Sequence, residues 1–324
     1  MKIFAKLVCG LSLTVFSVAA LAQSYPDRPI KLVVPFPPGG GTDFIARTLA
    51  NILTLENRWN IVVENRPGAG GNIGLASAAK ANPDGYTLVL GQTSNLAINP
   101  TLYTNLSYDP FQSFVPISLV ADSPLVMVGP GSAKYSTVQE FVKEVNTSEP
   151  NSMNFGLPGI GTVAQLSTVL FQREAGIKIV NVPYKGAADG VPALIGNQIH
   201  AYMSSVPTLL GAIEAGHIKA LGVTSKDRIR VLPNVPTIEE SGYKGFNATT
   251  WFGILAPAKT PKAIADQLNV AINKAVKTSA FIESMDKQGA TALGGSPADF
   301  TKRLRVDYDM WADVIKKSHI TKND

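Results

Sequence analysis

Two glycine-rich loops carry the most distinctive chemical pattern in the sequence. Residues 38–42 read PGGGT and residues 158–162 read PGIGT, so four of five positions match between two copies. Each copy follows a short apolar run and precedes a segment with helical periodicity. Glycine leaves the backbone amides uncovered, and the threonine of each loop is well placed as a helix N-cap. Because a helix start attracts anions, the pair predicts two walls of one anion-binding cleft.

Two further residues near these loops bear on the cleft. Gln165 stands three positions after Thr162, which is the spacing of a capping box at the start of a helix. Lys185 stands at a third junction between a predicted strand and a helix. An exposed lysine at the surface is the ordinary interpretation of Lys185, but this junction can also turn the side chain toward the cleft.

An enzyme that binds a dinucleotide is the first alternative. Residues 159–164 match the G-x-G-x-x-A pattern, but the acidic residue expected about 20 positions later is missing. Residues 67–74 are as glycine-rich as a phosphate-binding loop, yet they lack its Gly-Lys-Ser/Thr ending. We interpret this second segment as a surface turn that opens a helix.

An exported hydrolase is the second alternative. The sequence contains no G-x-S-x-G motif, and its three histidines, His200, His217 and His319, have no metal-ligand spacing. The acidic pair Glu239 and Glu240 is most simply explained as first-turn charges of a helix-like segment. We therefore predict no catalytic residue, no metal site and no cofactor.

The first 22 residues have the pattern of a secretory signal peptide. Lys2 and Lys6 form a short basic region before an apolar run over residues 7–21, and residues 20–22 have the small-x-small form of a cleavage site. The run is shorter than the roughly 20 residues that a spanning helix needs. We predict export to the periplasm with cleavage after Ala22.

Removal of this peptide changes the composition of the chain. The only cysteine, Cys9, leaves with it, which excludes disulfides and thiolate chemistry from the mature protein. Lys and Arg fall from 29 to 27 against 24 acidic residues, so the net charge falls from +5 to +3. The chain has 16% charged residues, against about 25% in an ordinary soluble domain. Its densest basic run, 226–230, also contains Asp227 and is most simply a solvated face, so we expect no nucleic-acid partner.

The mature chain alternates short β-branched runs with helical periods, which indicates an α/β protein. Its 324 residues suggest about two domains, but no linker divides them, so we expect the chain to cross between domains on extended strands near 120–127 and 250–256. The clearest late helix is 263–276. The predicted strands are 30–34, 61–63, 87–90, 125–128, 152–155, 177–182, 199–203 and 220–223.

Six segments together resemble one family, the extracytoplasmic solute receptors of tripartite tricarboxylate transporters, also called Bug or TctC proteins. The resemblance covers nearly the whole mature chain. The segments are YPDRPI at 25–30, VPFPPGGGTD at 34–43, VENRPGAGG at 63–71, PDGYTL at 83–88, VPYKGA at 182–187 and LPNVPT at 232–237.

The resemblance implies a two-lobed periplasmic binding protein of type II, a Venus flytrap with two crossing strands. Lobe 1 is expected to comprise residues 23–124 and 250–324, and lobe 2 residues 125–249. The implied ligand-binding residues are Phe36, Gly40, Gly41, Thr42, Asp43, Thr93, Ser94, Asn95, Gly159, Ile160, Gly161, Thr162, Tyr184, Lys185, Gly186, Ala187, Ser204 and Ser205.

The implied function is capture of a small anionic organic acid, such as a dicarboxylate, an acidic amino acid or an aromatic carboxylate. The membrane subunits of a tripartite transporter are the implied partners, and we expect a monomer. Departures from the family pattern at Leu157, Gln165 and residues 95–96 concern ligand specificity. A ligand sensor of a signalling system uses the same cleft and remains an alternative, as does an exported enzyme acting on an organic acid.

Overall fold

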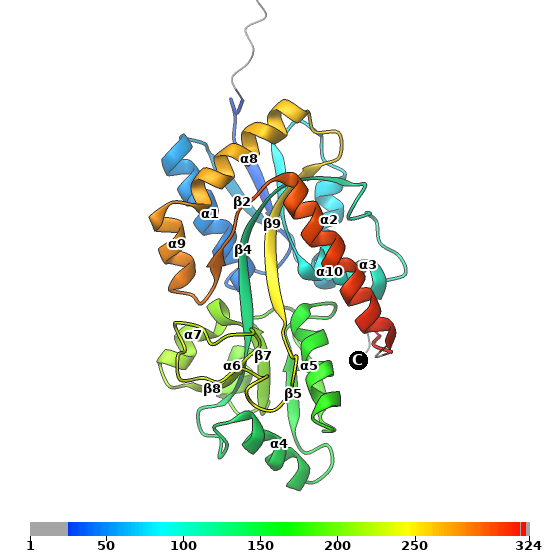
Figure 1. Ribbon diagram of the computed structural model, residues 1–324, viewed down its shortest axis with the longest axis vertical. Coiled ribbons are helices and arrows are strands. Elements are labelled where there is room, and N and C mark those ends of the chain that lie inside the picture. The colour runs from blue at the N-terminus through cyan, green and yellow to red at the C-terminus, as the bar shows by residue number, and fades with distance from the viewer. Residues whose placement is uncertain (1–24, 318, 322–324) are drawn as a thin grey trace, which may run out of the picture.

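Two long antiparallel strands join the halves of the molecule. The computed structural model describes residues 25–317 and 319–321, so the predicted signal peptide lies outside the described residues. Strands β4 (Phe114–Pro130) and β9 (Thr249–Pro257) pair over most of their shared length and run from one half to the other (Figure 1). They contain both predicted crossings, so the expectation of two crossing strands is confirmed.

Lobe 1 is the upper half of Figure 1 and is built on a mixed sheet of parallel and antiparallel strands. Its strand order is β2-β1-β3-β9-β4, with β10 paired to β4. The strands are β1 (Ile30–Val34), β2 (Ile61–Asn65), β3 (Thr87–Gln92) and β10 (Thr291–Ala292). The helices are α1 (Gly41–Asn57), α2 (Asn72–Ala79), α3 (Asn99–Leu102), α8 (Lys262–Val276), α9 (Ser279–Asp286) and α10 (Pro297–Lys317), with single turns at Ala69–Gly71 and Ser94–Ile98.

Lobe 2 is the lower half and continues the same sheet. The far end of β4 changes partners: β9 pairs with it as far as Pro124, and β7 and β8 pair with it from Leu125 and Val126. The strands are β5 (Asn154–Leu157), β6 (Val180–Pro183), β7 (Ala201–Ser205) and β8 (Ile218–Val223). The helices are α4 (Val138–Thr147), α5 (Val163–Glu174), α6 (Val191–Ile195) and α7 (Val206–Glu214). The partner change coincides with the predicted lobe boundary between residues 124 and 125. The division into these two lobes stays a prediction.

Most elements arise where the hydrophobic pattern predicts them. β1 has the predicted bounds, and α1 buries Ile45, Leu49 and Leu53 on one face, as helical spacing requires. β6 and β7 begin later than predicted, at Val180 and Ala201, and the apolar residues that suggested earlier starts, Ile177 and Ile199, are buried just before these strands. Residues 69–71 form the helix-opening turn expected before α2.

The two glycine-rich loops start their helices at different points. Thr162 is the N-cap of α5, and its side chain accepts a hydrogen bond from the Gln165 amide, as predicted. The same prediction is wrong for Thr42, because α1 begins at Gly41 and its N-cap is Gly40. Thr42 instead donates its hydroxyl proton to Gln92 Oε1 at 2.9 Å.

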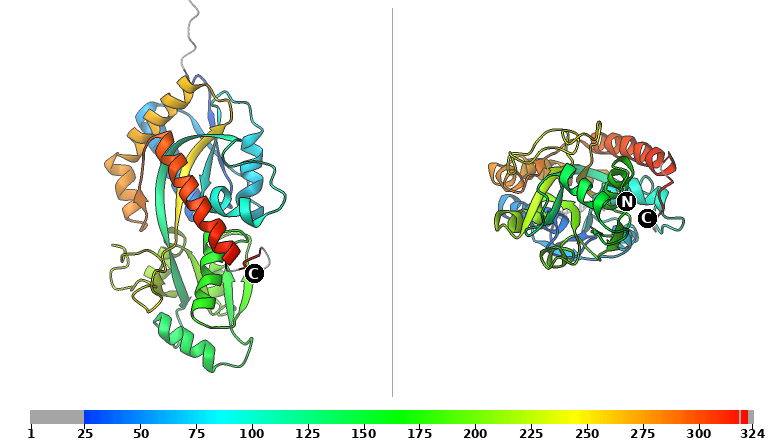
Figure 2. Two further views of the ribbon diagram at one scale, coloured as in Figure 1. Left: turned by 45° about the vertical axis from the view of Figure 1, so that its right-hand side comes forward. Right: turned by 90° about the horizontal axis from the view of Figure 1, so that it is seen from below.

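Helix α10 ties the lobes together along one side. It starts in lobe 1 and runs down toward α5 of lobe 2 (Figure 2). Trp311 and Ile315 near its end belong to the same buried cluster as Phe171 of α5. Separate clusters fill the remaining faces of lobe 1 and lobe 2. The side of the junction covered by α10 therefore shares a buried apolar core, beside a groove lined by Leu170, Trp311 and Val314.

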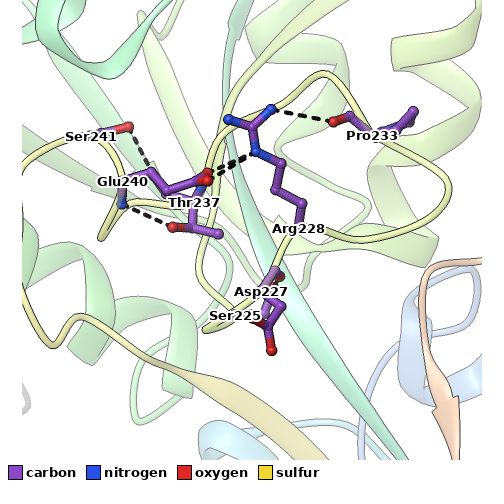
Figure 3. A network of polar contacts seen from close by, with 7 residues as sticks. All are labelled: Ser225, Asp227, Arg228, Pro233, Thr237, Glu240 and Ser241. Carbon is purple, nitrogen blue, oxygen red and sulfur yellow. Dashed lines mark hydrogen bonds and ion pairs between the residues drawn. The ribbon is translucent and has the colours of Figure 1, made fainter.

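The long return from β8 to β9 is held by a polar network (Figure 3). Arg228 binds the Glu240 carboxylate through Nε at 2.8 Å. Glu240 also accepts from the Thr237 amide, and its own amide donates to Thr237 Oγ1. The segment around Glu240 is thus a capped turn rather than a helix, and its carboxylate is engaged with Arg228.

Candidate interlobe ligand site

A small cavity, here called the inner cavity, lies between the lobes at the starts of α1 and α5. Its volume is about 60 Å³, and the crossing strands add Leu125, Thr250 and Phe252 to its wall. None of the described residues that line it carries a charged side chain. The predicted site residues that line it are Phe36, Gly40, Gly41, Thr42, Ser94, Thr162, Ala187, Ser204 and Ser205. A ligand there meets amides, hydroxyls and apolar groups.

The first amide of each bordering helix reaches a hydroxyl of the opposite lobe. The amide of Gly41, which begins α1 in lobe 1, donates to Thr208 Oγ1 of lobe 2 at 3.1 Å. The amide of Val163, which begins α5 in lobe 2, donates to Ser94 Oγ of lobe 1 at 3.2 Å. These are two of the amides that a helix leaves without an internal partner. The lobes therefore touch through reciprocal hydrogen bonds beside the inner cavity.

Asp43 does not line the inner cavity and instead supports the first loop. Its carboxylate accepts from the Gly39 amide at 3.1 Å, from Arg47 Nε at 2.9 Å and from Asn65 Nδ2 at 2.9 Å. Burial alone would raise the pKa of this carboxyl, but the hydrogen bonds from Arg47, Asn65 and Gly39 hold it below its ordinary value. The Asp43 carboxylate therefore stabilises the conformation of the first loop through these hydrogen bonds.

Two more predicted residues are fully buried behind the cavity wall. Thr93 Oγ1 accepts from the Trp251 amide at 3.0 Å and so fixes β9 against the end of β3. Asn95 Oδ1 accepts from the Gln92 amide at 3.0 Å, which holds the turn after β3. Neither side chain lines a cavity. Both position neighbours that do, Gln92 and Ser94.

The second loop is supported by a neutral side chain. The Gly161 amide donates to Gln165 Oε1 at 2.6 Å, while Thr162 donates its hydroxyl proton to the Gly159 carbonyl. Gly161 itself lines no cavity and packs against Asn99 of lobe 1. The structure therefore places Gln165 under the loop rather than in the site.

A second hollow, here called the outer cavity, adjoins the first. Its volume is about 550 Å³, and it shares Phe36 and Pro37 with the inner cavity. Its lining residues are Phe36, Pro37, 67–71, Gly159, Ile160, Tyr184, Lys185 and Asp189. Four further predicted residues are therefore in this second space, and Gly186 lies behind it, against Pro37.

Sequence reasoning missed the residues that the crossing strands and the end of β3 contribute. Gln92 is the clearest case, because it is a buried polar residue that ends an otherwise apolar strand. That signal was available in the sequence. Leu125 and Phe252 carry no such signal, because only the pairing of β4 with its distant partners brings them to the cavity.

Some buried donors near the site have no acceptor among the described residues. They are Gln165 Nε2 and Asn95 Nδ2, and both side chains are fully buried. Such groups are costly to leave unpaired in a protein interior. Gln165 lies under the second glycine-rich loop, and Asn95 lies in the turn after β3, beside Gly71.

The described histidines do not line the two cavities. His200 lines neither of them; its Nδ1 accepts from the Asn154 amide at 3.0 Å, and burial lowers its pKa. Within residues 25–317 and 319–321, no group of three or more His, Cys, Asp or Glu side chains is placed to hold a metal ion. Over the same residues, no helix is long and apolar enough to cross a bilayer.

Comparisons with known proteins agree with this architecture. The family model of the tripartite tricarboxylate transporter family receptor matches residues 45–320. Protein BugT of Bordetella pertussis is 37% identical over 314 residues, which cover 96% of each chain. The periplasmic binding protein BugD superposes with a TM-score of 0.87 at 34% identity, covering 92% of this chain and 99% of BugD.

A structure solved with a ligand is also similar. Rpa4515 of R. palustris, solved with adipate, superposes with a TM-score of 0.88 at 32% identity, covering 92% of this chain and 99% of Rpa4515. The match extends through both lobes and the crossing strands, so the predicted two-lobed α/β fold of a periplasmic binding protein is confirmed. The chain belongs to the tripartite tricarboxylate transporter receptor family, whose members are periplasmic solute receptors and include the Bug proteins.

Proposed function

We propose that this protein captures a small carboxylate in the inner cavity, closes its lobes around it, and delivers it to a tripartite tricarboxylate-type membrane transporter. The proposal includes export to the periplasm with cleavage after Ala22, action as a monomer, and no catalytic step. The observation that carries it is the inner cavity itself, which two helix starts from different lobes border and no charged side chain lines. Rpa4515, which is similar over its whole length, was solved with adipate.

The magnitudes support an anion at this place. Each helix start contributes about 0.3 to 1 kcal/mol to a nearby anion, and up to about 2 kcal/mol when partly buried. A hydrogen bond to a charged group adds about 1.5 to 3 kcal/mol. A micromolar complex needs about 8 kcal/mol. A few amides and hydroxyls therefore suffice without an arginine or lysine in the inner cavity.

Closure follows from the placement of the binding groups on both lobes. A ligand that contacts both helix starts binds the closed form better than the open form, so it shifts the equilibrium toward closure. The moving bodies are the predicted lobes, residues 23–124 with 250–324 and residues 125–249. Site residues on the loops of each lobe move with their own body.

A thermal-shift screen with small-angle scattering tests capture and closure. The panel contains dicarboxylates, tricarboxylates, acidic amino acids and aromatic acids, each beside its uncharged amide as a control. We expect one class of acids to raise the melting temperature and to reduce the radius of gyration, while the amides do neither. An acid that raises the melting temperature without compaction contradicts closure, and stabilisation by amides contradicts anion recognition.

Delivery requires a separate experiment with membranes. Crosslinking of the ligand-loaded protein in membrane preparations, followed by identification of the captured subunits, should yield transporter components. Capture of a sensor protein instead favours the signalling alternative. Conversion of any bound acid to a product on prolonged incubation would overturn the assignment as a receptor without catalysis.

A further inference from the structure

A groove behind the crossing strands, here called the hinge groove, lies between the two lobes. Its volume is about 580 Å³, and none of the residues that line it lines the inner or the outer cavity. The crossing strands form its floor, and each predicted lobe forms one wall. The floor residues are Asp122, Pro124 and Thr249, the lobe 2 wall contains residues 225–230, and the lobe 1 wall contains Asp286, residues 289–291 and Arg303.

The hinge groove and the inner cavity lie on opposite faces of the crossing strands. On β4, Pro124 lines the groove while its neighbour Leu125 lines the cavity. On β9, Thr249 lines the groove while Thr250 lines the cavity. Successive side chains of a strand point to opposite faces. A rotation about these strands that separates the lobes at the inner cavity therefore brings the walls of the hinge groove together.

The lobe 2 wall of the hinge groove is positively charged. Residues 226–230 contain three cations and one carboxylate. One of the cations, Arg228, is bound by Glu240 through Nε at 2.8 Å (Figure 3), so three cations stand against two carboxylates. Lys226 forms no ion pair with any residue that the structure describes. The positive charge of this wall is therefore carried by Lys226 and Arg230.

The floor and the lobe 1 wall are negatively charged. Arg303 of α10 lies between two carboxylates, with Asp307 at 3.0 Å from Nε and Asp122 at 3.5 Å from Nη2. Asp286 adds a third carboxylate, so three carboxylates stand against one cation. Asp122 Oδ1 is buried without a hydrogen-bond donor among the described residues. The two sides of the hinge groove therefore attract each other, and the attraction grows as the distance between them falls.

One contact already spans the hinge groove, and it is long. Nη1 of Arg230 in the lobe 2 wall lies 3.4 Å from Oδ2 of Asp286 in the lobe 1 wall, and the two side chains are 86% and 41% exposed. In the same arrangement the lobes touch at the cleft, where the Gly41 amide donates to Thr208 Oγ1. The charges of the hinge groove are therefore only partly paired while the lobes are in contact at the cleft.

We propose that attraction across the hinge groove favours the open form of the receptor. Opening brings Lys226 and Arg230 toward Asp122 and Asp286, whereas closure around a ligand holds these charges apart. This inference rests on the proposed function and adds its regulation, because residues that line no part of the ligand cavities set the fraction of ligand-free protein that is closed. A larger closed fraction strengthens the complex and slows release of the ligand.

Distances between spin labels on the two lobes test the inference without a ligand. Cys9 is the only cysteine and lies in the predicted signal peptide, so labels attach to the mature chain only at introduced cysteines. The label positions are Asn51→Cys on α1 and Glu214→Cys on α7, which are exposed and lie on opposite lobes. Pulsed electron paramagnetic resonance then gives the populations of the open and closed forms.

The groove variant is the double substitution Lys226→Glu with Arg230→Glu. Its matched control is Lys178→Glu with Lys244→Glu, which changes the charge of lobe 2 by the same amount at exposed lysines outside the groove. We expect the ratio of closed to open protein to rise about fivefold in the groove variant, as exposed charge pairs allow, and to stay at the wild-type value in the control.

A charge exchange across the groove separates attraction from a general structural effect. Arg230→Glu and Asp286→Arg should each raise the closed fraction alone, and the two together should return it toward the wild-type value because the pair is restored with its signs reversed. Raising the ionic strength should also increase the closed fraction of the wild-type protein but not that of the groove variant, since salt screens exposed charges.

The outcomes distinguish this inference from the proposed function. Equal distance distributions in all proteins, or the same shift in the groove variant and its control, would overturn the attraction across the hinge groove and leave the proposed function intact. If no acid of the thermal-shift panel stabilises the wild-type protein, the proposed function fails, whatever the spin-label distances show.

Discussion

The two glycine-rich loops have almost the same sequence, but the helices that follow them start and are capped in different ways. In the first, the helix starts at Gly41 with a glycine N-cap and no side-chain cap. In the second, it starts at Val163, after the hydroxyl of Thr162 has capped it. When the two helices are aligned by their N-caps, Thr42 therefore corresponds to Ala164 and not to Thr162. Relative to the matching loop residues, α1 therefore starts two residues earlier than α5.

The support beneath each loop also differs. The third residue of each helix accepts a hydrogen bond from the amide that precedes the N-cap: Asp43 from Gly39 and Gln165 from Gly161. The first loop uses a carboxylate held by Arg47, and the second uses a neutral amide. Both arrangements occupy the amide before the N-cap and leave the first helical amide directed at the cleft. The comparison teaches that a first helical amide that reaches the opposite lobe, rather than the threonine, is the shared feature.

The largest expected effect comes from filling the first loop at the cleft. A Cβ on Gly41 would lie 2.7 Å from Ser205 Oγ of the opposite lobe, while the backbone there needs no positive φ. Gly41→Val should oppose closure by about 1 to 3 kcal/mol, the usual cost of overpacking, and weaken ligand binding by about tenfold to a hundredfold. Titration calorimetry measures the loss, and the melting temperature of the ligand-free protein should change little.

The corresponding change in the second loop should behave differently. Gly161 has φ +73°, a backbone conformation that valine resists, and it packs against Asn99. Gly161→Val should therefore lower both affinity and melting temperature. Gly211→Ala, at a position with nothing within 4 Å, is the control for both variants. Unchanged affinity in Gly41→Val would refute the idea that the first loop meets lobe 2 on closure.

The second prediction removes the charge under the first loop. Asp43→Asn should cost about 1.5 to 3 kcal/mol of unfolding free energy at neutral pH, because it weakens hydrogen bonds to a buried carboxylate. The pKa of Asp43 in the folded protein is lower than its ordinary value of 3.8. Its contribution is therefore complete above that value and is lost as the pH falls through the folded pKa. Urea unfolding of both proteins across this acidic range should show the difference shrinking.

Asp266→Asn is a matched control for Asp43→Asn. Asp266 pairs with Lys262 at the same four-residue spacing, but both side chains are largely exposed. An exposed pair contributes about 0 to 1 kcal/mol, so this variant should remain near wild type at every pH. Equal losses of unfolding free energy in the two variants would show that burial under the loop does not strengthen the contribution of Asp43.

Local pattern predicted the elements of the fold, and long-range pairing determined the rest. β1 and α8 follow directly from a short β-branched run and from helical spacing, so their positions needed no tertiary information. The helix start at Gly41 did not, because three successive glycines allow several starts, and tertiary contacts of Gly41 with Thr208 and of Asp43 with the loop accompany the one observed. Capping rules alone therefore favoured Thr42 in error.

The residues of the candidate site also fall into two groups, those that a local pattern predicts and those that only long-range pairing brings to the cavity. Residues on the glycine-rich loops, such as Gly41 and Thr162, could be predicted because their loops carry a pattern. Leu125 and Phe252 could not, since they reach the cavity only when β4 pairs with β9 across more than a hundred residues. Asp43 has a charge that suggests ligand contact, yet Arg47 and Asn65 engage it in the folded protein.

The third prediction compares the two threonines. Thr162→Ala removes the N-cap of α5 and should cost about 1 kcal/mol. Hydrogen exchange should accelerate at the Gln165 amide, which loses its acceptor. Thr42→Ala is the contrasting variant, because no side chain caps α1, so exchange in the first turn of α1 should stay as in wild type. Similar acceleration in both helices would contradict the shift in helix start.

The smallest effect is expected at the reciprocal hydrogen bonds between the lobes. Ser94→Ala and Thr208→Ala each remove the acceptor of one first helical amide, Val163 or Gly41, so each should weaken ligand binding by about 0.5 to 1.5 kcal/mol. The loss should be larger for Ser94, because Ser94 is 1% exposed and water cannot replace its hydroxyl, whereas Thr208 is only partly buried.

Dissociation rates measured by stopped flow are the most direct readout of these two bonds, since a weakened closed state releases ligand sooner. Ser284→Ala, in which a serine that bonds within its own helix is changed, is the control. The double variant should be additive if the two bonds act at separate points of the cleft. A loss confined to Thr208→Ala would reverse the expected order and show that burial does not decide the strength of these bonds. The bond at Gly41 of the first loop would then matter more for closure than the bond at Val163, which follows the second loop.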